Sequence, residues 1–487
     1  MYGFVVFRRF LSLSGREINR FLAESNAATI PRVLDLFARH GDTFSRVNVV
    51  TAFHVVAKNS RALSPQSLVL LHGDGRFRRL WKRIEREIEA GSIDRAHLAS
   101  ITWSAGMLRV RAPSFVAHLS RQVKTHVTGM KAREFCFVAH GLAHLGGGGG
   151  GTRNKRIFEV LQKDAMSRID GLGPFQLSML VWAFARVGHR SDDFLGKCVD
   201  RAEVLCDDFL PKSVGVMAWS LAVLHYPVPT LLSRFSHLAL DQIDEYSVQA
   251  ISNLLWSGAV FRTLNEKLTG TVFAKLNRVL NDIGARACPK ETAPSPTLLY
   301  KNLDAIHSMS QLGNKSLSSI YQVDIELASL GMESLGFSNQ SRSLVLTHLK
   351  KRRRTRPSLF QSAVRDVLLE LGLKPFPEYE TGFYSVDFAL FFRPSLPGTD
   401  VTFEGLRSCV SDGGEETSAR VAVEVDGPAH FGYSKRLPLG HTVMKRRQLA
   451  QMGWKTVSIL YWEWNALDDV MRKQFVAEMI IRALSRS

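Results

Sequence analysis

Acidic and basic side chains that could do chemistry lie close together near the C-terminus of the sequence. Glu424 and Asp426 stand two positions apart in VAVEVDGPAHF, a predicted strand, so both carboxylates face one side of it. His430 follows them, and Lys445 belongs to the next predicted helix. Such groups could bind a divalent metal and move protons. The alternative is that the Asp-Gly-Pro sequence forms only a turn and the acids serve structure or RNA contacts.

A basic run, KKRRRTR at residues 350–356, could bind phosphate groups. The alternative is a solvated linker or helix end. A second basic cluster lies in the predicted helix that contains MKRRQL. The candidate nucleic-acid contacts from the two clusters are Lys350, Lys351, Arg352, Arg353, Arg354, Arg356, Lys445, Arg446 and Arg447.

After the basic run, the sequence pattern changes to a mixture of predicted helices and strands, which would position these residues. SLFQSAVRDVLLELGL and GHTVMKRRQLAQMGW have the pattern of helices, whereas YSVDFALFF, VAVEVDGPAHF and KTVSILYWEW have that of strands. This order predicts a small sheet flanked by helices over residues 358–487.

The chain before this domain contains a repeat of 37 residues. The segments ITWSAGML, VAHGLAHL, LVWAFARV, MAWSLAVL and LLWSGAVF align on five anchor positions, with spacings of 37, 42, 37 and 37. The anchors are Trp103, His140, Trp182, Trp219 and Trp256. The longer interval contains the glycine run 146–151.

Other positions of the repeat recur as well. Residues five and two before the anchor are apolar, as are those two and five after it apart from Gly258, and the residue three after it is always Gly or Ala. The apolar positions share one helix face, so each unit begins with a buried helix, and the small residue lets a neighbouring helix approach closely. Pro174 and Pro211 suit the first turn of this helix. The anchor tryptophans are interpreted as core residues that define the fold and not the ligand site.

A second amphipathic helix completes each unit, as in DDFLGKCVDRAEVL and PTLLSRFSHLALDQI. Looser copies are predicted at 51–59 and 301–313. Stacked helix pairs make an α-solenoid, predicted over residues 21–345 and joined to the C-terminal domain by a basic linker at 346–357.

The composition favours a polyanionic partner. The chain has 63 Lys and Arg against 45 Asp and Glu, a net charge of +18. Its five cysteines are scattered without a CxxC pair, which indicates neither a disulfide framework nor a zinc site. Since no apolar run approaches the roughly 18 residues of a membrane span, none is expected.

The first residues, MYGFVVFRRFLSLSGR, contain three arginines and no acid. This composition is typical of an organelle transit peptide, predicted over residues 1–20. A basic N-terminal helix is the alternative. The predicted compartment is the mitochondrial matrix, with the plastid as the alternative.

Residues 358–475 resemble the RAP domain in VEVDGPAHF, in MKRRQL, and in GW followed by a segment ending in YWEW. RAP domains stand at the C-termini of organellar RNA-processing and RNA-stability factors, including the FAST kinase-like family, and are abundant in apicomplexan parasites. The repeats over 93–285 are similar to the heptatricopeptide and octotricopeptide repeats of organellar RNA-binding proteins. These resemblances imply that the partner is organellar mRNA or rRNA, within a ribosomal or RNA-processing complex.

The RAP domain is in turn similar to very-short-patch-repair endonucleases and the PD-(D/E)xK fold, whose carboxylates hold a divalent metal that activates water. On this likeness, Asp387 in SVDF matches the first acid, Glu424 and Asp426 complete the metal site, and Mg²⁺ or Mn²⁺ would be the cofactor. The sequence departs from the pattern because Asp426 stands where a lysine is expected. Lys445 would have to replace that lysine, or His430 would have to act as general base.

The sequence therefore predicts an α-helical solenoid followed by a small α/β domain like that of restriction endonucleases. Non-catalytic RNA binding is the favoured function, in RNA stability, in processing or as a mitoribosome-associated component, and it needs no cofactor. The alternatives are a metal-dependent endoribonuclease and a protein-binding scaffold.

Overall fold

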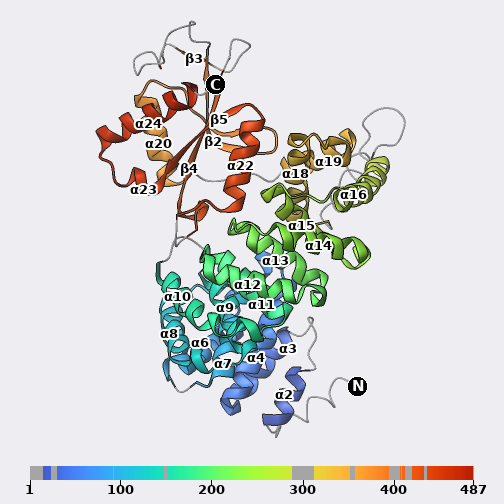
Figure 1. The fold of residues 1–487 in the computed structure, drawn as a ribbon. Helices are drawn as coiled ribbons and strands as arrows, with labels where there is room; N and C mark the ends of the chain where they lie inside the picture. The colour runs from blue at the N-terminus through green and yellow to red at the C-terminus, as the bar shows by residue number, and fades with distance from the viewer. Residues whose placement is uncertain are drawn as a thin grey trace. The chain divides into compact units, whose positions relative to one another are not determined.

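The computed structural model describes most of the chain as helices, with a small sheet near the C-terminus (Figure 1). The described residues are 15–23, 30–91, 93–146, 152–287, 312–350, 357–393, 406, 409–411, 419–432 and 436–485. The chain divides into two compact units, Met1–Leu205 and Cys206–Ser487. The second unit therefore contains the last helix pairs of the array as well as the C-terminal domain.

The first unit consists of helix pairs in two layers. The first helices of the pairs, called A helices, contact one another in sequence order, and so do the second helices, called B helices. The A helices are α4 (Arg46–Asn59), α7 (Arg95–Met107), α9 (Ala132–Leu145) and α11 (Pro174–Val187). The B helices are α6 (Gly75–Glu89), α8 (Pro113–His126), α10 (Thr152–Met166) and α12 (Asp192–Val204). Three further helices are α2 (Gly15–Ala23), α3 (Ile30–His40) and α5 (Pro65–Gly73).

Local sequence explains where these helices begin and end. Pro174 occupies the first turn of α11, as predicted, where its missing N–H costs nothing. The Asp94 side chain accepts the His97 N–H at the start of α7 and so satisfies one free donor of the first turn. Gly188 ends α11 with a φ of 69°, a conformation that favours glycine.

The A helices approach one another most closely at glycines. A Cβ atom on Gly141 would lie 2.2 Å from the carbonyl oxygen of Thr102, and one on Gly106 would lie 2.6 Å from that of Gly141. The small residue three after the anchor, predicted to allow close approach, is Gly106 in α7. Gly141, one residue after its anchor, contributes equally to the contact.

The second unit begins with further pairs of the array. Its A helices are α13 (Pro211–Val223), α15 (Val248–Phe261) and α18 (Asn314–Ser329), and its B helices are α14 (Pro229–Asp241), α16 (Glu266–Ala287) and α19 (Asn339–Lys350). The copy predicted at 51–59 lies in α4 of the first unit. Most of the copy predicted at 301–313 lies outside the described residues, and the helix that packs against α15 is α18.

The C-terminal domain is built on a five-stranded sheet. The strands are β1 (Phe376–Glu380), β2 (Ser385–Phe392), β3 (Val410–Ser411), β4 (Ala419–Asp426) and β5 (Trp454–Leu460). The order is β1-β2-β4-β5, and β3 also pairs with β2. Neighbours are antiparallel except β4 and β5, which are parallel and are connected by α22 (Gly440–Gln451).

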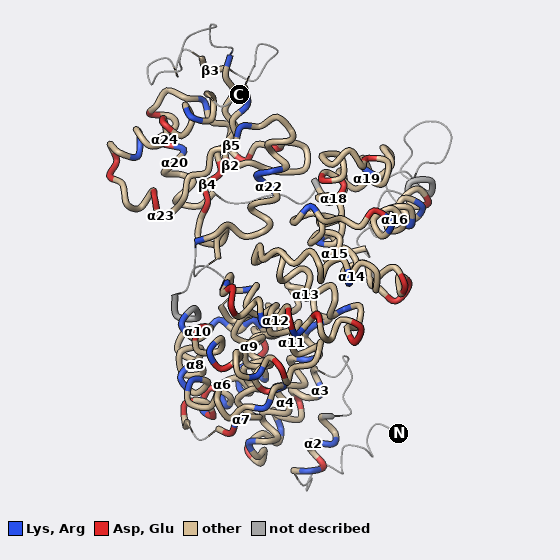
Figure 2. The backbone as a smooth tube through the Cα atoms, viewed as in Figure 1, with Lys and Arg blue, Asp and Glu red and all other residues tan. Residues whose placement is uncertain are grey.

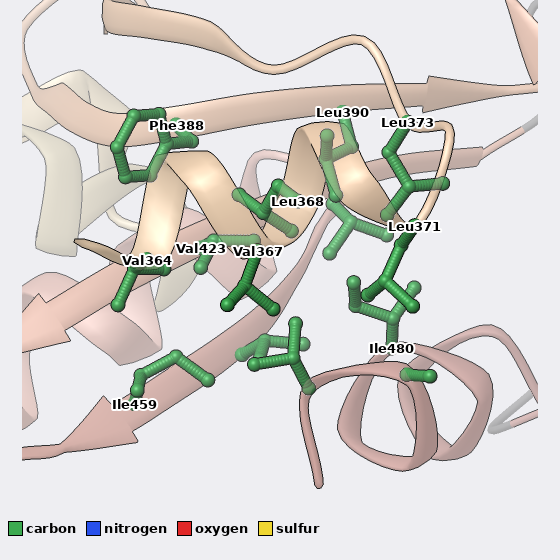
Figure 3. Packing of buried hydrophobic residues seen from close by; sticks show 14 of the residues in the cluster. Val364, Val367, Leu368, Leu371, Leu373, Phe388, Leu390, Val423, Ile459 and Ile480 are labelled. Carbon is green, nitrogen blue, oxygen red and sulfur yellow. The ribbon is translucent and has the colours of Figure 1, made fainter. Parts of the chain in front are cut away.

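The two faces of this sheet differ in chemistry. Helices α20 (Leu359–Glu370) and α24 (Asp469–Ser485) share an apolar core with one face, which includes Val423 and Val425 of β4 (Figure 3). Because side chains alternate along a strand, Glu424 and Asp426 point to the opposite face, where α22 lies. The predicted strand KTVSILYWEW ends at Leu460, since YWEW forms the short helix α23 (Tyr461–Trp464).

Candidate nucleic-acid interface

One stripe of each A helix in the first unit stays at the surface of the layer. In α9, Phe135, Val138 and Leu142 are fully buried, whereas His140 and His144 are half-buried. The surface positions are the anchor, the residues seven and three before it, and the residue four after it, which follow the helical period.

We call these positions on α4, α7, α9 and α11 the A ridge. Its members are Val47, Thr51, His54, Lys58, Ala96, Ser100, Trp103, Met107, Arg133, Phe137, His140, His144, Phe175, Met179, Trp182 and Arg186. The interpretation of the anchor tryptophans as core residues holds for Trp103, at 9% exposure, and for Trp256, at 4%, but is wrong for Trp182 and Trp219, which are half-buried. The rings of Trp103, His140 and Trp182 contact rings on the neighbouring A helices.

Rings of the A ridge contact one another from helix to helix. His54 lies 4.9 Å from Trp103, and Trp103 stacks on Phe137 at 5.7 Å, both between ring centroids. On the next pair of helices, His140 stacks on Trp182 at 4.6 Å. Because Phe137 and His140 share α9, the contacts extend across all four A helices.

The charged residues of the A ridge are all cations: Lys58, Arg133 and Arg186. The guanidinium of Arg133 lies 5.2 Å from the Phe137 ring centre, within the range of a cation–π contact. Burial, together with nearby Arg186, lowers the pKa of His144 to about 4. Burial likewise lowers the pKa of His54, with Lys58 and Arg133 adding to the effect. The imidazoles of both residues are therefore neutral at pH 7.

The second candidate site is the polar face of the C-terminal sheet. Figure 2 shows acidic positions on β4 and basic positions on α22. The Lys445 Nζ lies 2.6 Å from Glu424 Oε2, and the Arg446 Nη2 lies 2.5 Å from Asp426 Oδ2. His430 Nδ1 lies 3.1 Å from the other oxygen of Asp426. Four of the residues predicted to form a site are thus brought together with Arg446, but as ion pairs.

Glu424 is the most perturbed acid of this face. It is 4% exposed, and its Oε1 has no hydrogen-bond partner among the residues that the structure describes. Burial raises the pKa of Glu424 to about 7; the negative charges of Asp387 and Asp426 also raise it, whereas Lys445 lowers it.

Asp387 has a structural role at the point where β2 and β4 separate. Their ladder ends at Phe388 and Val423, and beyond it the Val425 N–H donates to Asp387 Oδ2 at 2.6 Å. Gln361 Nε2 donates to Oδ1 of the same carboxylate at 2.7 Å. Both oxygens of Asp387 therefore already accept hydrogen bonds within the domain.

These acids do not fit a bound metal ion. Within the described ranges, no three His, Cys, Asp or Glu side chains gather closely enough to hold one. The carboxylates that would have to converge on the ion instead have separate partners: a lysine for Glu424, an arginine for Asp426 and the backbone for Asp387.

The third cation of α22 connects the C-terminal domain to the array within the second unit. Arg447 donates to the carbonyl oxygens of Ala259 at 2.7 Å and Val260 at 3.0 Å, near the end of α15. It also pairs with Glu326 of α18, which is 0% exposed. Lys445, Arg446 and Arg447 all have protein partners, and their contact with nucleic acid stays a prediction.

Sequence reasoning missed Glu326 because neither of the two acids in the amphipathic pattern SIYQVDIELAS gives a sign of burial. The basic run predicted to bind phosphate begins at Lys350, the last residue of α19. The remainder of the run, 351–356, lies outside the described residues, as do residues 1–14 of the predicted transit peptide and 147–151 of the glycine run.

Helix pairs followed by this α/β domain define a class, the helical-repeat proteins with a C-terminal RAP domain. Residues 423–479, from β4 into α24, match the RAP domain family, which confirms the predicted resemblance. Residues 66–373 match the family described as RNA-editing substrate-binding complex 6 protein. This match covers more than half of the 487 residues, so the chain belongs to that family.

A relative from Oryza sativa subsp. japonica is described as a RAP domain-containing protein, chloroplastic. The chain is 23% identical to it over 453 residues, which are 88% of the chain and 62% of the relative. The chain thus spans a little over three fifths of the relative's length. Among the described helices, none combines the length and the apolar character that crossing a membrane requires.

Proposed function

We propose that this protein binds organellar RNA along the A ridge of its helix-pair array and acts in RNA processing. The observation that carries the proposal is the charge of that ridge. Its charged members are Lys58, Arg133 and Arg186, with no acid among its sixteen positions. Phosphate groups would release counterions on binding to such a surface, and the net charge of +18 favours their approach.

Two similarities to known proteins support this proposal. The matching family is named for binding the substrate of RNA editing, and the rice relative is named as a chloroplast protein. We place this protein in the mitochondrial matrix, from the arginine-rich, acid-free composition of its first residues, with the plastid as the alternative. There it would stabilise or process transcripts or associate with the ribosome, without cutting RNA itself.

Salt-dependent binding of single-stranded RNA tests the proposed interface. The affinity of the full chain for a fluorescent RNA of mixed sequence is measured by anisotropy over a range of salt concentrations. The test variant reverses the charges of the ridge cations: Lys58→Glu, Arg133→Glu and Arg186→Glu. The control makes the same charge change on exposed residues of B helices: Arg79→Glu, Arg121→Glu and Lys163→Glu.

We expect the ridge variant to lower the slope of log affinity against log salt by about 2, because each lost phosphate contact on a single strand removes about 0.7. The control should retain most of the slope. Equal losses in the two variants would remove the ridge as the interface. No binding by the unmodified chain would contradict the proposed function and favour a protein-binding scaffold.

Localisation and particle association are tested separately. A fluorescent fusion of the full chain should coincide with a mitochondrial marker, and coincidence with plastids would establish the alternative compartment. In a density gradient, the tagged protein should sediment with RNA or ribosomal particles and shift to lighter fractions after ribonuclease treatment. Sedimentation free of both would contradict the proposed role.

A further inference from the structure

Apart from Trp103, which is buried, the rings of the A ridge are partly exposed at the surface of the layer. The core of the array is formed by the other positions of the A helices, such as Phe135, Leu142 and Phe184, which are 0% exposed. Trp182, by contrast, is half-buried and has its ring partners on the neighbouring A helix. Flat side chains at the surface of the layer therefore need an explanation beyond packing.

The ring contacts around Trp182 are the densest on the A ridge. His140 stacks on Trp182 at 4.6 Å with 26° between the ring planes, and His144 lies 5.0 Å from the same indole. The two imidazoles lie 4.8 Å from each other. Arg186, exposed and one turn beyond Trp182 on the same helix, supplies a cation beside the rings.

We propose that the A ridge binds unpaired bases of single-stranded RNA by stacking on its rings, while Lys58, Arg133 and Arg186 contact the phosphates. This inference rests on the proposed function and specifies its ligand. Every base has a π face, so stacking on Trp, Phe or His tolerates many sequences. The bases of a duplex already stack on one another, so a duplex cannot offer its faces to the ridge.

Charge favours RNA over a peptide with similar flat groups. A proline-rich segment could also lie on an aromatic surface, but it would not account for cations without acids among the sixteen ridge positions. Neutral imidazoles beside the indoles keep the stacking surface itself uncharged, whereas the cations stand beside it. Rings and cations together match a chain that alternates flat bases with phosphates.

The test compares Trp182→Leu with Trp182→Phe, which keeps a ring, and with Trp81→Leu as the control. Trp81 is a half-buried tryptophan on the B helix α6 of the same unit. Each full-length protein is titrated with single-stranded RNA, with a duplex of the same sequence and with an abasic sugar-phosphate oligomer. We expect Trp182→Leu to weaken single-strand binding by about tenfold or more, as loss of one stacked base implies, without changing the salt slope.

The variant Trp182→Phe should keep most of the affinity, and Trp81→Leu should bind as the unmodified chain does. Affinity for the abasic oligomer should be the same in all of them. If circular dichroism shows that Trp182→Leu does not fold, His144→Ala replaces it, because His144 is a half-buried ring 5.0 Å from Trp182. A smaller loss in the same direction is then expected.

The outcomes separate this inference from the proposed function. Unchanged single-strand affinity in the ring variants, together with a loss in the charge-reversed ridge variant, would overturn stacking and leave RNA binding in place. An equal loss for RNA and for the abasic oligomer would also overturn stacking, because the rings would then act only through the shape of the ridge. No RNA binding by the unmodified chain would instead contradict the proposed function.

Discussion

Arg447 of α22 and Glu326 of α18 form a buried ion pair, with 3.0 Å between Nη2 and Oε2. Glu326 is 0% exposed and also accepts from Gln448 Nε2 at 3.1 Å, while Arg262 Nε lies 3.4 Å from its other oxygen. The Arg447 guanidinium also donates to carbonyl groups at the end of α15, where the helix dipole favours a cation. The basic helix of the RAP domain thus joins that domain to the last A helices of the array.

Arg447→Ala should therefore destabilise the second unit strongly. Removal of one partner of a buried ion pair costs about 3–5 kcal/mol when the other charge is left uncompensated. Arg262 still pairs with Glu326 after this change, so the loss should lie toward the lower end of that range. Arg447→Lys should recover only part of this, since the compact ammonium of lysine lacks the planar, widely spaced donors with which the guanidinium reaches the carboxylate and the two carbonyls. Urea unfolding and hydrogen exchange of α15, α18 and α22 would measure the effect. Arg482→Ala on α24, where the side chain is 69% exposed, is the control, and equal stability of the two alanine variants would contradict the assignment.

Gly440, the first residue of α22, allows a second contact of the same kind. A Cβ atom there would lie 1.9 Å from the carbonyl oxygen of Ala222 in α13, so Gly440→Ala must displace one of the two helices. We expect a loss of about 1–3 kcal/mol, the usual cost of overpacking. The matched control is Gly75→Ala, also at the first position of a helix, with nothing within 4 Å of the added atom. A melting temperature that falls equally in both variants would refute the contact.

The repeat pattern predicted the helix pairs well, because burial inside a helix follows a short period. Phe135 and Leu142 are fully buried as their spacing from the anchor implied. The same period could not show that His140 and Trp182 face along the layer surface, since that depends on the position of the neighbouring A helix. A stripe of apolar residues has two flanks, and sequence alone does not distinguish them.

In the C-terminal domain, the sequence could not show contacts whose partner is distant along the chain. Arg447 was assigned to phosphate because basic runs often bind it, but Glu326, its partner in the fold, lies 121 residues away. Asp387 was correctly placed on a strand, but its carboxylate accepts the Val425 N–H where two strands separate. Neither relationship leaves a pattern in the local sequence.

Glu424 should give the second unit a distinct pH dependence. Because its pKa rises to about 7 on folding from an ordinary value near 4.5, the folded state binds the proton more tightly than the unfolded state does. The contribution of Glu424 to stability is therefore fully present below pH 4.5 and is lost as the pH rises to 7. Glu424→Gln cannot titrate and lacks this loss.

The difference in unfolding free energy between the unmodified protein and Glu424→Gln should fall as the pH rises from 4.5 to 7, by at most about 3 kcal/mol. Above pH 7 the difference should level off. Urea unfolding at several pH values measures it. Exposed Glu478→Gln on α24 is the control and should show a much smaller trend. A difference that is constant with pH would mean that Glu424 is not perturbed by its surroundings.

Gly141→Ala tests whether the spacing of the A helices sets the ring contacts of the A ridge. The added Cβ would lie 2.2 Å from the Thr102 carbonyl oxygen, so α7 and α9 must move apart. We expect a net loss of roughly 1–2 kcal/mol in the first unit, because overpacking outweighs the better helix propensity of alanine. The rings of Trp103 and Phe137, 5.7 Å apart on these two helices, should separate as well.

Thermal unfolding and anisotropy with single-stranded RNA would detect the two effects. Gly73→Ala, at the end of α5 with no atom within 4 Å, should leave both unchanged. A stable Gly141→Ala protein with unaltered RNA affinity would show that the close approach of α7 and α9 is not needed for the ridge.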